Sequence, residues 1–191
     1  MFDKLLEIIR SDEFRVQLAE LNDNFFNLKQ EIHIRNLLLV LFNRYHSQEG
    51  FRAIAEYRVP SKDIRIDLAL VSKNDQKNAF KIEFKYHFPK DKGGFSKYGE
   101  SIQKHFIGRE SDGFILIVCD SDTNGRENFE NTWLNDKTIF SDLSSEDLKW
   151  KNNLKEKFED KDLKAESYFH EIKVDKPFKT TYHFFILERE K

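Results

Sequence analysis

Two alternating segments separated by a short polar stretch constrain the fold more than any other feature of the sequence. The first runs from Ile64 to Val71 and the second from Ala79 to Phe88. A period of two sends successive side chains to opposite faces of a strand. The polar residues 72–78 between them are too few for a crossover and more than a tight hairpin needs, so an antiparallel pair is predicted. Charge gathers on one face of the second strand, which carries Lys81, Glu83, Lys85 and His87 opposite Phe80, Ile82, Phe84 and Tyr86.

The flanking segments predict that this pair belongs to a larger mixed sheet covered by helices. A continuously apolar run such as Gly113 to Asp120 is typical of a strand inside a sheet. Apolar residues at helical spacing predict helices on both sides of the strand region. The fold class is therefore α/β or α+β, with a central mixed β-sheet flanked by helices. The expected helices are Phe2 to about Leu21, about Asn27 to Tyr45, Ser96 to about Ile107 and most of Thr123 to Lys164, and the further strands are Ala53 to Val59 and Thr180 to Glu188.

Length and the absence of repeats or linker-like stretches predict one domain across residues 1–191. Its core is expected over about residues 27–120, followed by a helix-rich C-terminal extension over about 123–191. A lone cysteine, Cys119, cannot form an internal disulfide, and its apolar surroundings indicate a buried hydrophobe.

Charge and hydropathy restrict the location and the partners. The N-terminus has no signal-peptide core, and the apolar run Leu37 to Phe42 is too short to span a bilayer, which predicts a soluble cytoplasmic protein without a membrane partner. A formal net charge of −2 argues against a histone-like coat on nucleic acid. It leaves room for DNA binding through charge segregated onto one face.

Acidic-x-Lys triplets occur six times, and only their context separates them. Of these, Glu83-Phe84-Lys85 lies in strand-like sequence directly after another acid-bearing strand, which supplies Asp67. Glu171-Ile172-Lys173 is also strand-like but has no such neighbour within hairpin reach. The others lie in a turn or in helical surface patterns: Asp75-Gln76-Lys77, Asp147-Leu148-Lys149, Glu159-Asp160-Lys161 and Asp162-Leu163-Lys164.

The chemistry of phosphodiester hydrolysis explains why this triplet and its neighbouring acid matter. The reaction needs a divalent cation to neutralise charge on the phosphate and a water activated in line with the scissile bond. Mg²⁺ is commonly held by one or two carboxylates, and a nearby lysine can position the water or stabilise the transition state. Spacing of two residues places Glu83 and Lys85 on one strand face, with Asp67 able to lie across from them. The simpler interpretation is a charged solvent face on a hairpin.

Arg65-Ile66-Asp67-Leu68-Ala69-Leu70 followed by Lys81-Ile82-Glu83-Phe84-Lys85 resembles the PD-(D/E)XK nuclease superfamily, which includes many restriction endonucleases. The resemblance covers roughly residues 27–120 and extends to the order of elements, with Ile66 standing where the family name has Pro. It implies a restriction-endonuclease-like core. It also implies that Asp67 and Glu83 hold Mg²⁺, or Mn²⁺ as a substitute, with help from the Phe84 carbonyl, and that Lys85 assists the water.

Glu31, on the helix before the sheet, fits the additional acidic residue that many members of that superfamily carry. Its spacing to Ile34 and Leu38 places it near the inward stripe, where an unpaired carboxylate would be costly. A metal shell or another cation would relieve that cost. An i, i+4 pair with Arg35 on a half-exposed face explains the residue equally well.

A second set of polar residues follows on the helix after the strand pair. Gln103 is similar to the helical glutamine of some exonuclease branches, although the tyrosine that follows in those enzymes is missing at the usual spacing. Lys104, His105 and Arg109 are weaker candidates for phosphate contacts, with ordinary surface charge as the simpler interpretation. His87 shares the face of Glu83 but lies near the strand end, where a structural role is expected.

These observations predict a Mg²⁺-dependent endodeoxyribonuclease of restriction or defence type, with DNA as its partner. A double-strand cutter with one site per chain is expected to act as a two-fold homodimer. Two alternatives stay open at this point. One is a catalytically inactive nuclease fold that serves binding or assembly, and the other is the same site acting on RNA.

Overall fold

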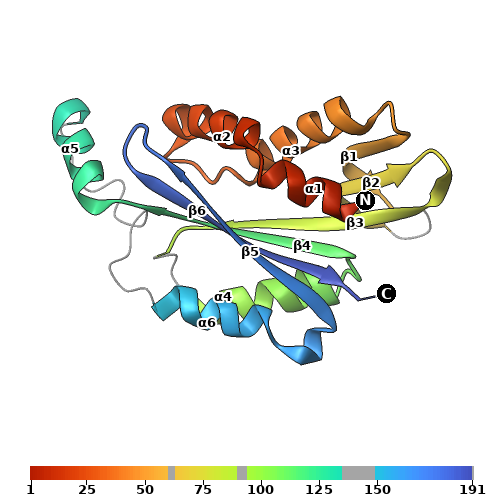
Figure 1. Cartoon of the computed structure of the whole chain (residues 1–191). Helices are drawn as coiled ribbons and strands as arrows, with labels where there is room; N and C mark the ends of the chain where they lie inside the picture. Colours follow the sequence, from red (N-terminus) through yellow and green to blue (C-terminus); the bar gives the residue numbers. More distant parts are fainter. Residues whose placement is uncertain (60–62, 90–93, 135–148, 191) are drawn as a thin grey trace.

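A six-stranded mixed sheet organises the chain in the computed structural model, which describes residues 1–59, 63–89, 94–134 and 149–190 (Figure 1). The strand order is β1-β2-β3-β4-β6-β5. Only the β3–β4 pair is parallel, and the other four pairs are antiparallel. The strands are β1 (Phe51–Arg58), β2 (Arg65–Ser72), β3 (Asp75–His87), β4 (Gly113–Ser121), β5 (Ala165–Val174) and β6 (Thr180–Arg189).

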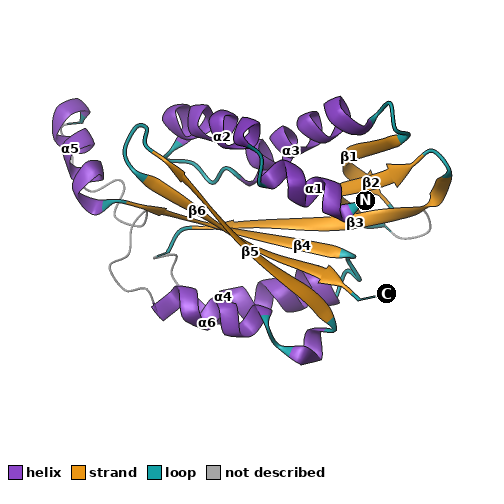
Figure 2. Cartoon of the chain, viewed as in Figure 1, coloured by secondary structure: helices purple, strands orange, loops and turns teal. Residues whose placement is uncertain are grey.

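Helices cover both faces of the sheet (Figure 2). One face carries α1 (Phe2–Ile9), α2 (Asp12–Phe25) and α3 (Glu31–His46), and the other carries α4 (Gly94–Ser101), the π-helical turn η1 (Ile102–Ile107) and α6 (Lys149–Phe158). The remaining helix, α5 (Thr123–Trp133), follows β4 at the end of the sheet. The predicted mixed sheet flanked by helices is confirmed. None of the helices in the described ranges is long and apolar enough to cross a bilayer.

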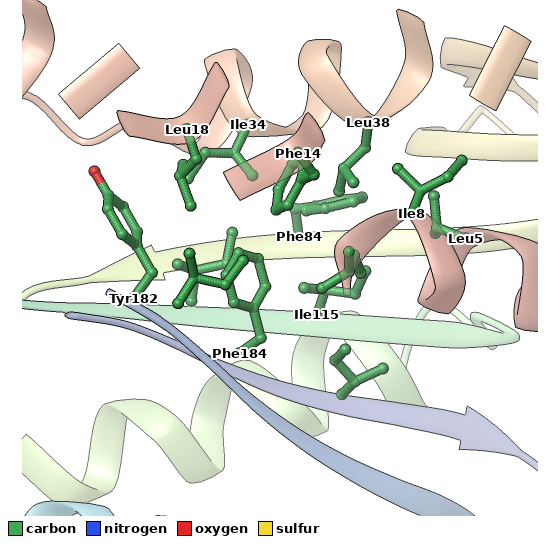
Figure 3. Packing of buried hydrophobic residues seen from close by; sticks show 14 of the residues in the cluster. Leu5, Ile8, Phe14, Leu18, Ile34, Leu38, Phe84, Ile115, Tyr182 and Phe184 are labelled. Atoms are coloured by element: carbon green, nitrogen blue, oxygen red, sulfur yellow. The ribbon is translucent and has the colours of Figure 1, made fainter. Parts of the chain in front are cut away.

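Two clusters of buried apolar side chains, one on each face of the sheet, pack the helices against the strands. Alternation along β4 explains both, because Ile115 and Ile117 face α1–α3 while Phe114 and Leu116 face α4 and α6. Figure 3 shows the first cluster, in which Phe14 and Phe184 meet edge to face with ring centroids 6.0 Å apart. Burial on both sides accounts for the continuously apolar sequence of β4, and the predicted interior position of that strand is confirmed.

The expected helix from Phe2 to about Leu21 is two helices. Ser11 interrupts it, because the Ser11 hydroxyl accepts a hydrogen bond from the Phe14 N–H at 3.1 Å and so caps a new helix. The apolar residues on either side of the break still face the sheet, since Leu5, Ile9 and Leu18 are all buried. Apolar spacing therefore identified the buried residues but not the cap that divides them.

The C-terminal half also differs from expectation. Helices α5 and α6, with the short 3-10 turn η3 (Lys161–Leu163), agree with the helical prediction for Thr123 to Lys164, whose residues 135–148 lie outside the described residues. The extension over 123–191 is not helix-rich throughout, because β5 and β6 form its second half. Strand β6 pairs with β4 along nine residue pairs, so this segment completes the sheet rather than adding to a finished core.

Candidate functional site

The site lies at the fork where β2 and β3 separate. Their antiparallel ladder, which confirms the predicted pairing, runs from Ser72–Asp75 to Leu68–Ile82. Strand β3 nevertheless continues beside β4 as far as the pair His87–Val118. In the fork the Phe84 N–H donates a 2.8 Å hydrogen bond to Oδ2 of Asp67. A side-chain carboxylate thus takes the place of a strand carbonyl, which fixes Asp67 beside the middle of β3.

Glu83 points toward the α4 side of the sheet and is completely buried. Nη1 of Arg109 donates to both of its carboxylate oxygens, at 2.9 and 2.8 Å. Nδ1 of His105 lies 3.1 Å from Oε2 of the same carboxylate. A carboxylate buried to this degree is costly unless it is paired and hydrogen-bonded, and these two residues provide that pairing.

Lys85 reaches from β3 to the beginning of α3. Its ammonium donates to the Phe84 carbonyl at 2.6 Å and lies 3.2 Å from Oε1 of Glu31. Arg35, the alternative partner of Glu31, instead pairs with Glu56 and Asn36. Glu31 therefore pairs with Lys85 at the site and not with Arg35 in the i, i+4 arrangement. Glu31 also occupies the first turn of α3, where the helix dipole favours negative charge.

Buried hydrogen bonds fix the start of α3 and hence the position of Glu31. Gln30, the residue before the helix, is buried and donates to the Phe25 carbonyl at 2.9 Å. Its Oε1 accepts from the Tyr182 hydroxyl at 2.7 Å, and that hydroxyl also lies 2.6 Å from Oδ1 of Asn22. Since Tyr182 belongs to β6, the C-terminal strand helps to place Glu31.

The turn that carries His105 and Arg109 is held just as firmly. The helix after β3 changes from α to π geometry at Ile102–Ile107, an irregularity that often occurs at functional sites. Ser111 is buried, and its hydroxyl donates to the His105 carbonyl at 2.8 Å. Arg189 donates to the carbonyls of Phe106 and Ser111 at 2.9 and 3.0 Å. These bonds set the direction from which Arg109 approaches Glu83.

Electrostatics single out Asp67. Burial raises the pKa of this carboxyl above its ordinary value of 3.8, and the negative charge of Glu83 raises it further. The Phe84 N–H bond and the Lys85 ammonium act in the opposite direction, while Glu31 adds a smaller upward contribution. For Asp67, burial and negative neighbours therefore outweigh the compensation from the Phe84 N–H and the Lys85 ammonium. A bound cation would add the missing positive charge.

The predicted nucleic-acid-contacting residues divide into two groups. Gln103 and Lys104 are exposed on η1, away from the carboxylates, whereas His105 turns inward to Glu83. Arg109, which the sequence offered as a weak candidate for a phosphate contact or as ordinary surface charge, donates to both oxygens of Glu83. The local sequence pattern does not predict this ion pair, because Glu83 and Arg109 are 26 positions apart and come together through the β3–α4–β4 crossover. His87 packs edge-on against Tyr98 with ring centroids 5.3 Å apart, consistent with the expected structural role.

The donor atoms suit Mg²⁺ in kind. Asp67, Glu83 and the Phe84 carbonyl are oxygen ligands on two adjacent strands, and Mg²⁺ characteristically takes one or two carboxylates with water and phosphate completing its shell. Two of the donors are otherwise engaged: Arg109 holds Glu83, and Lys85 holds the Phe84 carbonyl. Within the described ranges, no group of three or more His, Cys, Asp or Glu side chains is arranged to hold a metal ion. Metal binding therefore requires Arg109 and Lys85 to shift.

A second polar concavity lies far along β4, away from the fork. This cleft of about 590 Å³ is lined by the end of β4, the start of α5 and the β5–β6 turn. It contains Lys173 from the other strand-borne triplet, together with Asp120, Asp122 and Asp175. Asp122 is already used as the cap of α5, accepting from the Gly125 N–H at 2.7 Å. Glu171 pairs with Lys151 and His183, so this triplet does not reproduce the arrangement at the fork.

Comparisons with family models, with curated proteins and with solved structures find no significant match for this chain.

Proposed function

We propose that the protein is a Mg²⁺-dependent phosphodiesterase acting on nucleic acid, with a restriction-endonuclease-like core and DNA as its substrate. The observation that carries this proposal is the tertiary convergence of three carboxylates and a lysine from three elements. Glu31 lies 54 positions from Lys85 in sequence, yet their charged atoms are 3.2 Å apart. Asp67 lies close enough to Glu83 and Glu31 for their charges to raise its pKa. If these charges only formed the solvent face of a hairpin, Glu31 would have no need to approach Lys85 and Asp67.

The residues have separable roles in this proposal. Asp67, Glu83 and the Phe84 carbonyl would hold the metal, which would supply charge neutralisation at the phosphate and a water of lowered pKa. Lys85 orients that water and stabilises negative charge that develops on the phosphate. Glu31 contacts the Lys85 ammonium, which also donates to the Phe84 carbonyl, and the two contacts together limit its freedom of rotation. Glu31 is thus a positioning residue for Lys85.

One feature favours a second candidate, a non-catalytic module with the same fold. Both oxygens of Glu83 accept from Arg109, and the Phe84 carbonyl accepts from Lys85, so the charges are already balanced by protein groups. A network of this kind can serve only to hold η1 against the sheet. In that case the protein would bind neither Mg²⁺ nor Mn²⁺, which calorimetry measures directly.

The decisive experiment is a cleavage assay with purified protein, Mg²⁺ or Mn²⁺, and four substrates: single- and double-stranded DNA and RNA. We expect cleavage of DNA that is abolished by a chelator and falls by a factor of at least ~100 in Glu83→Gln and Lys85→Ala, the range attributed to electrostatic and acid–base groups. If RNA is cleaved in preference to DNA, the active-site assignment stands and the substrate is RNA.

Lys173→Ala is the matched control, because Lys173 is an exposed lysine of the other strand-borne triplet and lines the cleft at the end of β4. It should cleave like the parent protein. Loss of cleavage in Lys173→Ala with full activity in Lys85→Ala would move the active site to that cleft. Cleavage that survives unchanged in Glu83→Gln and Lys85→Ala would mean that the fork is not the active site.

A further inference from the structure

Arg109 uses only one of its three guanidinium nitrogens to hold the site together. Nη1 alone contacts both oxygens of Glu83 and, at 3.2 Å, the main-chain carbonyl of Arg65 on β2. Among the residues that the structure describes, neither Nε nor Nη2 of Arg109 has a hydrogen-bond partner. A guanidinium carries five N–H donors in a fixed planar fork suited to phosphate, so most of this recognition capacity is unused.

Exposure differs sharply across the ion pair. The Arg109 side chain is 33% exposed, whereas the Glu83 side chain is 0% exposed. His105, the other partner of Glu83, is 13% exposed. Arg109 engages both oxygens of Glu83 and is the more exposed of the two partners of this carboxylate, so a cation that takes Glu83 as a ligand competes with Arg109.

We infer that Arg109 is a latch, which blocks the metal-binding carboxylate in the free protein and transfers to a phosphate of the nucleic acid when substrate and metal bind. The inference rests on the proposed function, since it assigns regulation to the same site. A divalent cation and a guanidinium on one carboxylate repel each other, which drives Arg109 away from Glu83. The phosphate backbone offers a bidentate acceptor for the displaced fork.

The position of Arg109 suits this exchange. The residue directly follows Gly108, which closes the π-helical turn, and its backbone is anchored nearby through Ser111. A rotation of the side chain alone can thus move the guanidinium without disturbing the fold. Coupling follows from linkage: a substrate that holds Arg109 raises metal affinity, and metal that occupies Glu83 raises affinity for the phosphate backbone.

The test measures metal affinity without nucleic acid, by calorimetric titration of Mn²⁺ into the parent protein and into Arg109→Gln and Arg109→Ala. Because the competing cation is removed, we expect both variants to bind Mn²⁺ about 10-fold more tightly than the parent. Arg109→Gln keeps an amide donor near Glu83, so a result can be obtained even if Arg109→Ala folds poorly. At saturating Mn²⁺, both variants should show a raised KM for DNA, because the phosphate contact is lost.

Arg15→Ala is the control, and its Mn²⁺ affinity should match that of the parent. Arg15 is an exposed arginine on α2 that, among the described residues, forms its ion pair with Asp12 in the same helix turn. Unchanged or weaker Mn²⁺ binding in both Arg109 variants would overturn the latch while leaving the proposed nuclease intact. Binding in the variants but not in the parent would support the latch in its strongest form. Absence of Mn²⁺ binding in all proteins would overturn the latch and the metal-dependent function together.

Discussion

Removal of Arg109 should destabilise the metal-free protein far more than removal of an ordinary surface arginine. Arg109→Ala leaves the fully buried Glu83 with Nδ1 of His105, 3.1 Å from Oε2, as its remaining side-chain partner. Breaking a buried ion pair by deleting one partner costs roughly 3–5 kcal/mol. The lower end applies, about 3 kcal/mol, because His105 is retained and Arg109 is itself one-third exposed. For a domain of this length the melting temperature should fall by roughly 6–12 °C.

A double-mutant cycle separates the pair from its surroundings. Glu83→Gln alone removes the charge that needs compensation and should cost about 1 kcal/mol, since Arg109 can turn to solvent. With Glu83→Gln in the Arg109→Ala background, the double variant should lose about 2 kcal/mol instead of the ~4 kcal/mol sum of the two single losses, giving a coupling energy of about 2 kcal/mol.

Urea unfolding followed by circular dichroism, in chelator at pH 7, provides the free energies for all four proteins of the cycle. Arg15→Ala should change the free energy of unfolding by no more than ~0.5 kcal/mol, the usual limit for an exposed site. If Arg109→Ala is no more destabilising than this control, or if the coupling energy is zero, then Glu83 does not depend on Arg109 for its burial. The description of the site as a charge-balanced fork would then be refuted.

Three further perturbations test other parts of the structure. Asp67→Asn should raise the melting temperature of metal-free protein at neutral pH while abolishing Mn²⁺ binding. A carboxyl whose folded pKa lies above its unfolded value costs stability only when ionised, so this gain should fade as the pH falls through the raised pKa toward 3.8. Tyr182→Phe removes the hydroxyl whose single proton serves the buried amide oxygens of Asn22 and Gln30, and urea unfolding should show a loss of about 2 kcal/mol. Ser111→Ala removes the bond to the π-helical turn, and thermal melting should show a loss of about 1 kcal/mol together with slower cleavage.

These perturbations share a physical theme. The side chains at the fork are stabilised by mutual charge balance rather than by water, and each substitution removes one sign of charge or one support. Substitutions of Asp67 and Arg109 should therefore change the stability of the metal-free protein in opposite directions. Loss of the Asp67 carboxylate removes its repulsion with Glu83 and raises stability. Loss of the Arg109 guanidinium leaves the charge of Glu83 without its main partner and lowers stability. Residues selected only for stability would not place an incompletely compensated Asp67 next to a buried Glu83.

The sequence by itself determined five of the six strands in the described residues, the antiparallel pairing of β2 with β3 and the interior place of β4, but it did not predict β5. These depend on local period and composition: alternation places Ile66, Leu68 and Ile82 in the core, and a strand buried on both faces must be apolar throughout. The same alternation placed Glu83 and Lys85 on one face. Context among the triplets, combined with the family resemblance, selected Asp67 as their neighbour.

Only the tertiary structure decided how those charges are balanced. Glu31 pairs with Lys85 instead of Arg35, and Arg109 closes over Glu83, because the crossover through α4 and the buried anchors at Gln30 and Ser111 bring distant segments together. Likewise, the sequence predicted a strand over Thr180 to Glu188, but only the structure shows that β6 pairs with β4 and that β5 pairs with β6 at the edge of the sheet. Local periodicity reports which face of an element is buried, whereas ion-pair partners depend on three-dimensional approach between residues far apart in the chain.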